Sequence, residues 1–354
     1  MNIVIRRIYE YSLERRLTVL AASILTPIII GNIAIWISSG DPLIFIYSFT
    51  WSLLDPGLLR YFIPLTLCGL GLLIPYRAGI WNIGAEGQFI AGAILSTFIA
   101  LYIIDPALPR IMAIPLILLA GGVAGSIIGL IPAILKTELN VNEVLATLML
   151  NYIMIGIGNY LVYGPWRGVE EYGYPRTDLF PRNTWIMDID FFGYKVNIFM
   201  TSLTILIGIL LYIYLRYSRF GFELTVAGLN PRAATYSGIN LKAIIWRSMA
   251  ISGWLAGLAG SAEVLSVHHQ LIRVDAVSAG YGYIAIIVAW ISGLHPIYAI
   301  IGGYFIGGLL DVSHTLQIFI GIPYGVTNLY VGLLLLFIAG LEFLKKYRVE
   351  IRVD

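Results

Sequence analysis

The sequence predicts an all-α, polytopic membrane protein with about ten transmembrane helices in a single domain, residues 1–354. Two observations lead to this fold class. First, 59% of the residues are hydrophobic and 12% are charged, so there is too little polar surface to cover a water-soluble domain. Second, runs of about 20 residues without Asp, Glu, Lys or Arg recur along the chain, and a helix of that length spans a bilayer.

These apolar runs define ten expected spans. They are residues 17–37, 58–76, 86–104, 111–135, 143–163, 198–215 and 243–267, two spans within 276–310, and residues 326–344. The first run is long enough to span and has no evident cleavage site, so we expect a span there rather than a signal peptide. The aromatic segment 42–54 predicts an interfacial helix. In the fourth span, Gly121, Gly125 and Gly129 predict a close contact with another helix.

The Lys and Arg residues predict the orientation in a cell membrane. With the N-terminus inside, fifteen of the 22 fall on cytoplasmic segments and seven on outer ones, so both termini are expected to be cytoplasmic. Residues 164–197 then form an extracellular loop and residues 216–242 a cytoplasmic loop.

Residues 77–88, RAGIWNIGAEGQ, lie between two apolar runs and predict an interruption of a membrane helix. Glycines loosen the backbone, and Asn82, Glu86 and Gln88 bring hydrogen-bonding groups to a depth where lipid cannot satisfy them. A carboxylate at this depth indicates a functional site. The alternative is that Glu86 caps a helix N-terminus, and the two interpretations are compatible.

The fifth span begins with a second polar group. Glu143, Thr147 and Asn151 are four residues apart, so they line one helical stripe, with Asn142 just before it. Such a stripe faces the protein interior or a pathway, although hydrogen bonds to a neighbouring helix alone would also explain it. A further intramembrane carboxylate, Glu263, lies in the seventh span.

The glycine-rich entry to the third span has a counterpart, residues 278–283 (SAGYGY), at the entry to the eighth. The first is approached from inside and the second from outside. This layout predicts an inverted repeat with re-entrant segments around a central pathway.

Several enzyme classes are excluded by missing motifs. The chain has no GxxxxGK[ST] phosphate loop, no HExxH or Cys-His metal motif and no GxSxG nucleophile turn, so we expect no catalytic residue, no metal and no cofactor in this chain. Its single cysteine, Cys68, cannot form an intrachain disulfide. No nucleic-acid partner is expected.

A short amphipathic helix is predicted over residues 231–236 of the cytoplasmic loop. Asn230 is placed to cap it, Pro231 suits its first turn, and Gly228 and Gly238 bracket it. Such a helix suits docking into a groove of another protein. The alternative is an interfacial helix lying on lipid.

Four motifs in this order resemble those of the ABC-importer permeases for nucleosides and simple sugars. They are RAGIWNIGAEGQ at 77–88, NEVLATLMLNYI at 142–153, GLNPRAATYSGI at 228–239 and SGWLAGLAGSAEVLS at 252–266, and the similarity covers nearly the whole chain. The sequences of the first two motifs are most similar to those of the branch that depends on a basic membrane lipoprotein. The branched-chain amino acid and ribose permeases of the family have differently worded motifs.

The resemblance implies a permease subunit that hydrolyses no ATP itself. Its expected partners are ABC ATP-binding subunits, which bind the ATP, a second homologous permease, an extracellular substrate-binding lipoprotein and the lipid bilayer. It implies that Gly228, Asn230, Pro231, Ala233, Ala234 and Gly238 couple to the ATPase. It places Asn82, Glu86, Gln88, Asn142, Glu143 and Asn151 near the substrate pathway, to which the polar stripe and the seventh span add Thr147 and Glu263.

One departure concerns the entry to the eighth span. The family usually has Gly-Phe-Asp/Glu-Gly there and a basic residue after it, whereas this chain has GYGY at 280–283 and the uncharged residues 293–295. The family's substrate details therefore do not carry over directly. Two alternatives remain: a permease of this family for another solute, such as a sugar or amino acid, and an ion-coupled secondary transporter using Glu86, Glu143 or Glu263 as its proton site.

Overall fold

The computed structural model describes residues 2–7, 26, 29–30, 33, 36, 43–169, 173–191, 194–320, 333 and 347–352. The expected first and tenth spans lie almost entirely outside these residues. The chain divides into two compact units, residues 56–307 and a smaller unit of residues 1–55 with 308–354.

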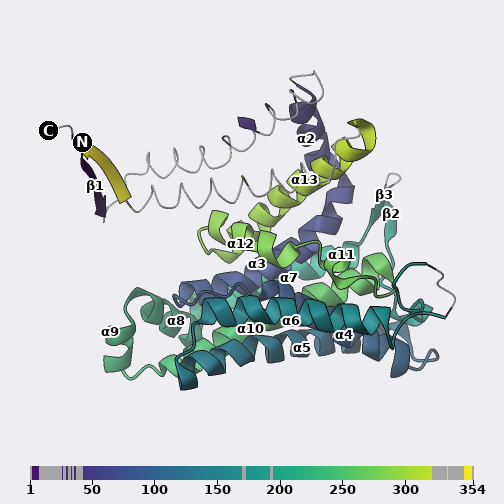
Figure 1. The fold of residues 1–354 in the computed structure, drawn as a ribbon, viewed down its shortest axis with the longest axis horizontal. Helices are drawn as coiled ribbons and strands as arrows, with labels where there is room; N and C mark the ends of the chain where they lie inside the picture. The colour runs from purple at the N-terminus through teal and green to yellow at the C-terminus, as the bar shows by residue number, and fades with distance from the viewer. Residues whose placement is uncertain are drawn as a thin grey trace. The chain divides into compact units, whose positions relative to one another are not determined.

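The larger unit is a helical bundle (Figure 1). Its helices are η1 Pro56–Leu58, α3 Leu59–Arg77, α4 Ala85–Tyr102, α5 Arg110–Leu139, α6 Glu143–Tyr163, η2 Arg182–Thr184, α7 Ile198–Tyr217, α8 Arg219–Leu229, α9 Pro231–Tyr236, α10 Leu241–Glu263, the π-helix η3 Val264–His268, α11 Val274–Ser278, α12 Tyr281–Ile291 and the first part of α13 Pro296–Ile320. Strands β2 Ile189–Phe191 and β3 Tyr194–Val196 form an antiparallel hairpin, in which Ile189 pairs with Val196.

Seven segments of the described chain are long and apolar enough to cross a membrane, and they correspond to the expected second to eighth spans. α6 has the bounds that the sequence predicts, and α13 begins at the predicted break before Pro296. The polar segment 164–197 contains only η2 and the β2–β3 hairpin as regular structure among its described residues. The all-α membrane fold is thus confirmed.

Glycines hold the centre of the bundle together. α10 packs against α3, α4 and α5, and most of α3, α4 and α10 is buried. A Cβ atom at Gly125 of α5 would lie 2.0 Å from the carbonyl oxygen of Gly253 in α10, and one at Gly92 of α4 would lie 2.1 Å from that of Gly257. Only glycine permits such backbone contact. The close helix contact predicted for α5 is therefore confirmed, and its partner is α10.

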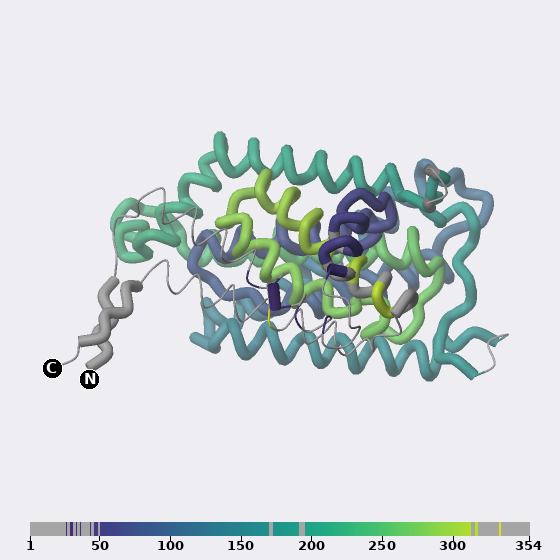
Figure 2. Tube along the Cα trace, turned by 90° about the horizontal axis from the view of Figure 1, so that it is seen from above, coloured from purple at the N-terminus to yellow at the C-terminus, as the bar shows by residue number. Residues whose placement is uncertain are grey.

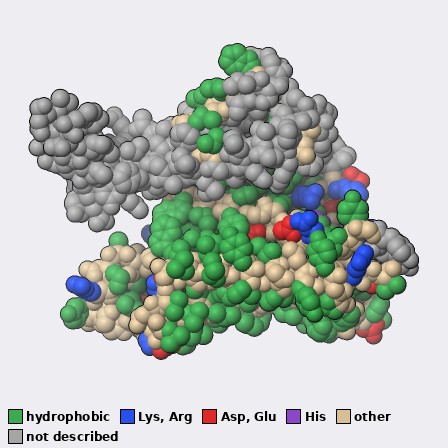
Figure 3. Space-filling model, in the orientation of Figure 1, with side chains coloured by type: hydrophobic (Ala, Val, Ile, Leu, Met, Phe, Trp, Pro, Cys, Tyr) green, Lys and Arg blue, Asp and Glu red, His purple; other side chains and the backbone are tan. Residues whose placement is uncertain are grey.

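α6 and α7 lie along opposite edges of this bundle (Figure 2), and less than a third of each apolar stretch is buried. Figure 3 shows hydrophobic side chains along the visible face of the unit and Lys and Arg side chains mainly toward its ends. This distribution is the one expected for a bundle surrounded by lipid. Within the unit, α8 and α9 lie at one end and the β2–β3 hairpin at the other (Figure 1).

The smaller unit contains α2 Ile44–Leu54, the remainder of α13 and two terminal strands. α2 lies where the sequence predicts an interfacial helix. Ser52 of α2 donates a hydrogen bond of 2.6 Å to Asp311 of α13. β1 Asn2–Arg7 and β4 Tyr347–Arg352 pair antiparallel. The predicted elements include no strand at either terminus, although Tyr347, Val349 and Ile351 alternate with charged residues in β4.

Candidate functional site

The break between α3 and α4 is organised by Asn82. The chain leaves the helical conformation after Arg77 and passes Gly79 at φ +76°, a backbone angle that favours glycine. The Asn82 side-chain oxygen accepts a hydrogen bond of 2.8 Å from the N–H of Gly84, and its backbone carbonyl accepts one of 2.8 Å from the Tyr76 hydroxyl. Asn82 therefore fixes the turn that restarts the helix.

Asn82 also joins the start of α4 to α10. Its amide nitrogen donates to the Ser252 hydroxyl at 2.9 Å, and its amide group exchanges hydrogen bonds of 3.3 Å with that of Gln88. All three side chains are buried. Buried amide groups are stable only when they are paired, and this small network pairs them.

α6 supplies the other polar groups at the break. Thr147 accepts a hydrogen bond of 3.2 Å from the backbone of Ile83. Asn151 accepts one of 2.8 Å from the N–H of Gly87 and donates one of 2.8 Å to the carbonyl of Ile83. Because Asn151 lies eight residues into α6, the start of α4 is roughly 12 Å from that helix end. The break is therefore deep in the bundle, where backbone groups need such partners.

Glu86 connects this break to the entry of α12. Its side chain is 2% exposed, and its Oε2 atom accepts a hydrogen bond of 2.8 Å from the N–H of Gly282. A Cβ atom at Gly282 would lie 2.3 Å from the Glu86 nitrogen, so the first turns of the two helices touch. The two glycine-rich entries singled out in the sequence thus meet. Glu86 does cap a helix, but that helix is α12 rather than its own.

Three predicted pathway residues have their main side-chain partners outside this network. Asn142 is exposed and caps α6 through the N–H groups of its first turn. Glu143 forms an ion pair of 2.6 Å with Lys136. Glu263 is buried near the end of α10, with its Oε1 atom 3.6 Å from the Nε2 atom of His268.

Several residues that the sequence interpretation did not place in the site lie beside the break. The hydroxyl of Tyr283 accepts a hydrogen bond of 3.2 Å from Asn151. The rings of Tyr76, Trp81 and Trp290 pack against one another, with ring centroids 5.6 to 5.8 Å apart. Tyr76 and Trp290 are stacked, and Trp81 is tilted against both. The position of Trp81 inside the RAGIWN motif was the sequence feature that could have placed it in the site. No sequence feature could have placed Trp290 there, because it lies in an apolar run.

The loop helix α9 has the predicted bounds and the predicted cap. The side-chain oxygen of Asn230 accepts hydrogen bonds of 3.1 Å from the N–H groups of Arg232 and Ala233. Ala233 is exposed, and Tyr236 and Leu229 are 93% and 82% exposed. Ala234, by contrast, is completely buried.

The structure explains why glycine occupies both positions that bracket α9. Gly238 adopts φ +78° after α9. A Cβ atom at Gly228 would lie 1.8 Å from the carbonyl oxygen of Arg77, so α8 rests directly on the end of α3. α8 and the broken stretch are thereby in backbone contact.

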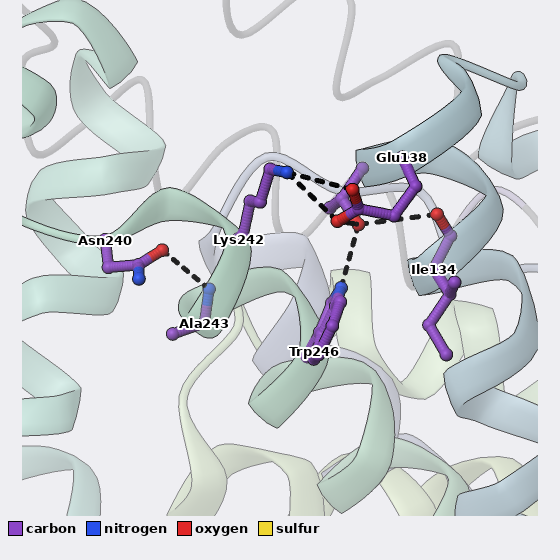
Figure 4. Close-up of polar contacts among 7 residues, drawn as sticks. Ile134, Glu138, Asn240, Lys242, Ala243 and Trp246 are labelled. Atoms are coloured by element: carbon purple, nitrogen blue, oxygen red, sulfur yellow. Dashed lines mark hydrogen bonds and ion pairs between the residues drawn. The ribbon is translucent and has the colours of Figure 1, made fainter.

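Two further contacts anchor the end of this loop (Figure 4). Lys242 at the start of α10 donates to both carboxylate oxygens of Glu138 at 3.0 Å. The Trp246 ring nitrogen donates to the Thr137 hydroxyl at 2.8 Å (Figure 4). These bonds join the end of α5 to the first turns of α10.

No group of three or more His, Cys, Asp or Glu side chains that could hold a metal ion occurs in the part of the chain that the structure describes. The polar groups at the break are amides, hydroxyls and one carboxylate. They can exchange hydrogen bonds with a polar solute.

A family model described as "branched-chain amino acid transport system / permease component" matches residues 56–339. Three curated relatives are similar over most of their length. A glucose ABC transporter permease of Haloferax volcanii is 29% identical, with 96% of this chain and 90% of the relative covered. A guanosine ABC transporter permease of Bacillus subtilis is 29% identical, with 80% of each covered. A nucleoside ABC transporter permease of Lactococcus lactis is 32% identical, with 75% and 71% covered.

Proposed function

Because the chain belongs to the family of branched-chain amino acid transport system permease components, we propose that it is the permease subunit of an ATP-driven importer for nucleosides or related simple sugars. The chain is a multi-pass membrane permease. We propose the identity of the solute, the residues that contact it, the partner subunits and the cytoplasmic position of both termini.

The solute class is supported by the relatives and by the chemistry of the break. Those relatives are named as permeases for glucose, guanosine and nucleosides, and their identities to this chain are similar. Asn82, Gln88, Thr147 and Asn151 are uncharged, and each can bond to a sugar hydroxyl or a base edge. They now bond to one another and to the backbone. Solute binding therefore requires that some of these bonds be exchanged as the bundle rearranges.

One observation carries the transport proposal: the N-termini of α4 and α12 meet at Glu86 and Gly282, deep in the bundle. Interrupted helices whose ends meet near the midplane are typical of transporter binding sites. The alternation of access then needs a rearrangement at this meeting point. Two permeases rocking against each other would provide it.

The coupling to ATP is assigned to α8 and α9. The apolar side chains of Tyr236 and Leu229 are almost fully exposed. Exposed apolar residues of this kind fit a groove in a partner protein. α8 touches the end of α3 through Gly228. A partner that pulls on α9 would therefore move the backbone that leads directly into the broken stretch.

The partners follow from this assignment. We propose two ABC ATP-binding subunits on the side of α9, a second homologous permease, and a substrate-binding lipoprotein on the side of the β2–β3 hairpin. ATP is bound by the partner subunits and not by this chain.

Co-purification tests the assembly. The tagged chain is isolated from its native membrane and the bound proteins are identified by mass spectrometry. We expect an ATP-binding subunit and a second permease in stoichiometric amounts. A chain that is reproducibly isolated alone would contradict the proposal.

Ligand profiling tests the solute. The binding lipoprotein that accompanies the chain is titrated with guanosine, adenosine, ribose, glucose and leucine. We expect micromolar or tighter binding of a nucleoside or simple sugar. Binding of leucine alone would move the chain to the amino acid branch of its family.

A further inference from the structure

A cavity of about 320 Å³ opens in the larger unit between the end of α3, the α7–α8 turn and the start of α13. Its lining includes two arginines, Arg77 and Arg216, the ring of His295 and the hydroxyl of Tyr212. Thr225 also lines it, but its hydroxyl already donates to the carbonyl of Gly221 at 2.9 Å. Among the described residues, no Asp or Glu lines it. The cavity therefore offers positive charge and hydrogen-bond donors to an anion.

The two arginines are differently held. The Nε atom of Arg77 donates a hydrogen bond of 2.7 Å to the carbonyl of Leu294, which fixes the side chain against the α12–α13 turn. Arg216 is exposed at the end of α7 and has no ion pair among the described residues. Arg219, only three residues later, is paired with Glu223 at 2.6 Å. The charge of Arg216 is thus left for a ligand, whereas that of Arg219 is used within the chain.

His295 adds unused hydrogen-bonding capacity. Its ring packs against Tyr212 and Tyr298, with centroids 5.2 and 4.6 Å away. Its Nδ1 atom is buried and has no hydrogen-bond partner in the described part of the chain. Burial, and then the charge of Arg77, lower the pKa of His295, so the ring is neutral near pH 7. A buried polar atom without a partner calls for an explanation, and a ligand in the cavity gives one.

We propose that this cavity is a binding site for a phosphate group. Guanidinium groups match phosphate oxygens in geometry and charge, and the Tyr212 hydroxyl adds a further donor. Phe222 lines the cavity and is exposed. Ile213 and Tyr217, which follow the lining residues Tyr212 and Arg216 in the chain, are exposed on α7. A basic pocket next to an exposed apolar helix suits the headgroup of an anionic lipid. A free phosphate in the cytosol offers the same chemistry, and the experiment below distinguishes it from a lipid headgroup.

The test uses the full chain, purified in detergent with its partner subunits and delipidated. It is incubated with equimolar phosphatidylglycerol and phosphatidylcholine, and bound lipid is counted by native mass spectrometry. We expect preferential retention of phosphatidylglycerol by the wild type. Arg216→Gln should lower this retention about fivefold, the effect expected for one Arg at a membrane surface. His295→Phe, which keeps the ring between Tyr212 and Tyr298, should also lower it.

Arg219→Gln is the matched control, because it removes the same charge from the same turn but outside the cavity. It should leave lipid retention unchanged. In a second arm, inorganic phosphate is titrated by calorimetry. Phosphate binding that depends on Arg216 without any lipid preference would identify a free phosphate as the ligand. Equal lipid retention by wild type, Arg216→Gln and Arg219→Gln, together with no phosphate binding, would overturn the proposal.

Discussion

The carboxylate of Glu86 accepts a hydrogen bond of 2.8 Å from the backbone N–H of Gly282, 196 residues away in the chain. This bond places a buried acidic group between the N-termini of α4 and α12. Both helix dipoles are positive there, so both favour the carboxylate. The absence of a side chain at Gly282 lets the two backbones touch.

The first prediction concerns that bond. Glu86→Leu leaves the Gly282 N–H buried without an acceptor, which costs about 1–3 kcal/mol. Glu86→Gln keeps an oxygen that can accept the bond and should cost less. Thermal unfolding of the purified protein should therefore rank wild type above Glu86→Gln and Glu86→Leu last. A Leu variant as stable as the wild type would show that the bond contributes nothing.

The second prediction concerns the contact between α5 and α10. Gly125→Ala places a methyl group 2.0 Å from the carbonyl oxygen of Gly253, which the helices can accommodate only by separating. We expect a loss of about 3 kcal/mol and little folded protein in the membrane. Gly156→Ala on α6 is the control, because no atom lies within 4 Å of its new methyl group. Equal yields of the two variants would contradict the packing described here.

The third prediction concerns Asn151. Asn151→Ala removes the partners of the Gly87 N–H and the Ile83 carbonyl, both deep in the bundle. Each orphaned group costs about 1–3 kcal/mol. Asn142→Ala is the comparison on the same helix, and loss of that exposed cap should cost about 1 kcal/mol. Unfolding measurements should therefore separate the two variants, and equal stabilities would count against a buried role for Asn151.

Much of the fold was readable from local patterns. Polar, apolar and capping residues predicted α6 and α9 with their observed bounds, because those signals act within one helix. The glycines of residues 77–88 likewise predicted the break. Spacing alone also placed Thr147 and Asn151 on one face, and both are buried.

Contacts between distant segments were not readable in this way. The acceptor role of Glu86 toward α12 depends on how helices 196 residues apart pack. The stripe pattern also missed a nearer partner: it assigned Glu143 to a pathway, and Glu143 pairs with Lys136, seven residues earlier, at 2.6 Å. A periodic pattern shows which face a residue occupies but not which partner occupies the other side.

The fourth prediction separates docking from folding in the α9 loop. Ala233 is exposed and Ala234 is buried, although the family resemblance implied an ATPase contact for both. Ala233→Glu should leave the melting temperature unchanged and reduce the co-purified ATP-binding subunit at least tenfold. Ala234→Glu should lower the melting temperature as well, because it buries a charge. Val169→Glu adds the same charge at an exposed position of the 164–197 segment and should affect neither quantity. Undiminished ATPase binding by Ala233→Glu would remove α9 from the interface.

The fifth prediction concerns pH. Burial lowers the pKa of His269, whose ring stacks on Trp185 with centroids 4.1 Å apart. The unfolded state then binds more protons between the folded pKa and the ordinary value of about 6.5. The stabilisation from neutral His269 is thus complete above about pH 6.5 and is lost as the pH falls below it. His269→Phe keeps an aromatic ring but cannot be protonated, so its melting temperature should fall less between pH 7.5 and 5.5. If the melting temperatures of both proteins fall equally over this pH range, His269 is not a source of the pH dependence.

The central claim is that this permease moves its solute only when partner subunits hydrolyse ATP. The direct measurement is uptake of radiolabelled guanosine and glucose into proteoliposomes that contain the co-purified complex, with its binding lipoprotein outside. We predict uptake of one of these solutes that requires ATP on the side of α9 and is abolished by Ala233→Glu. Uptake by the chain alone, without ATP and driven by a pH gradient, would contradict the claim.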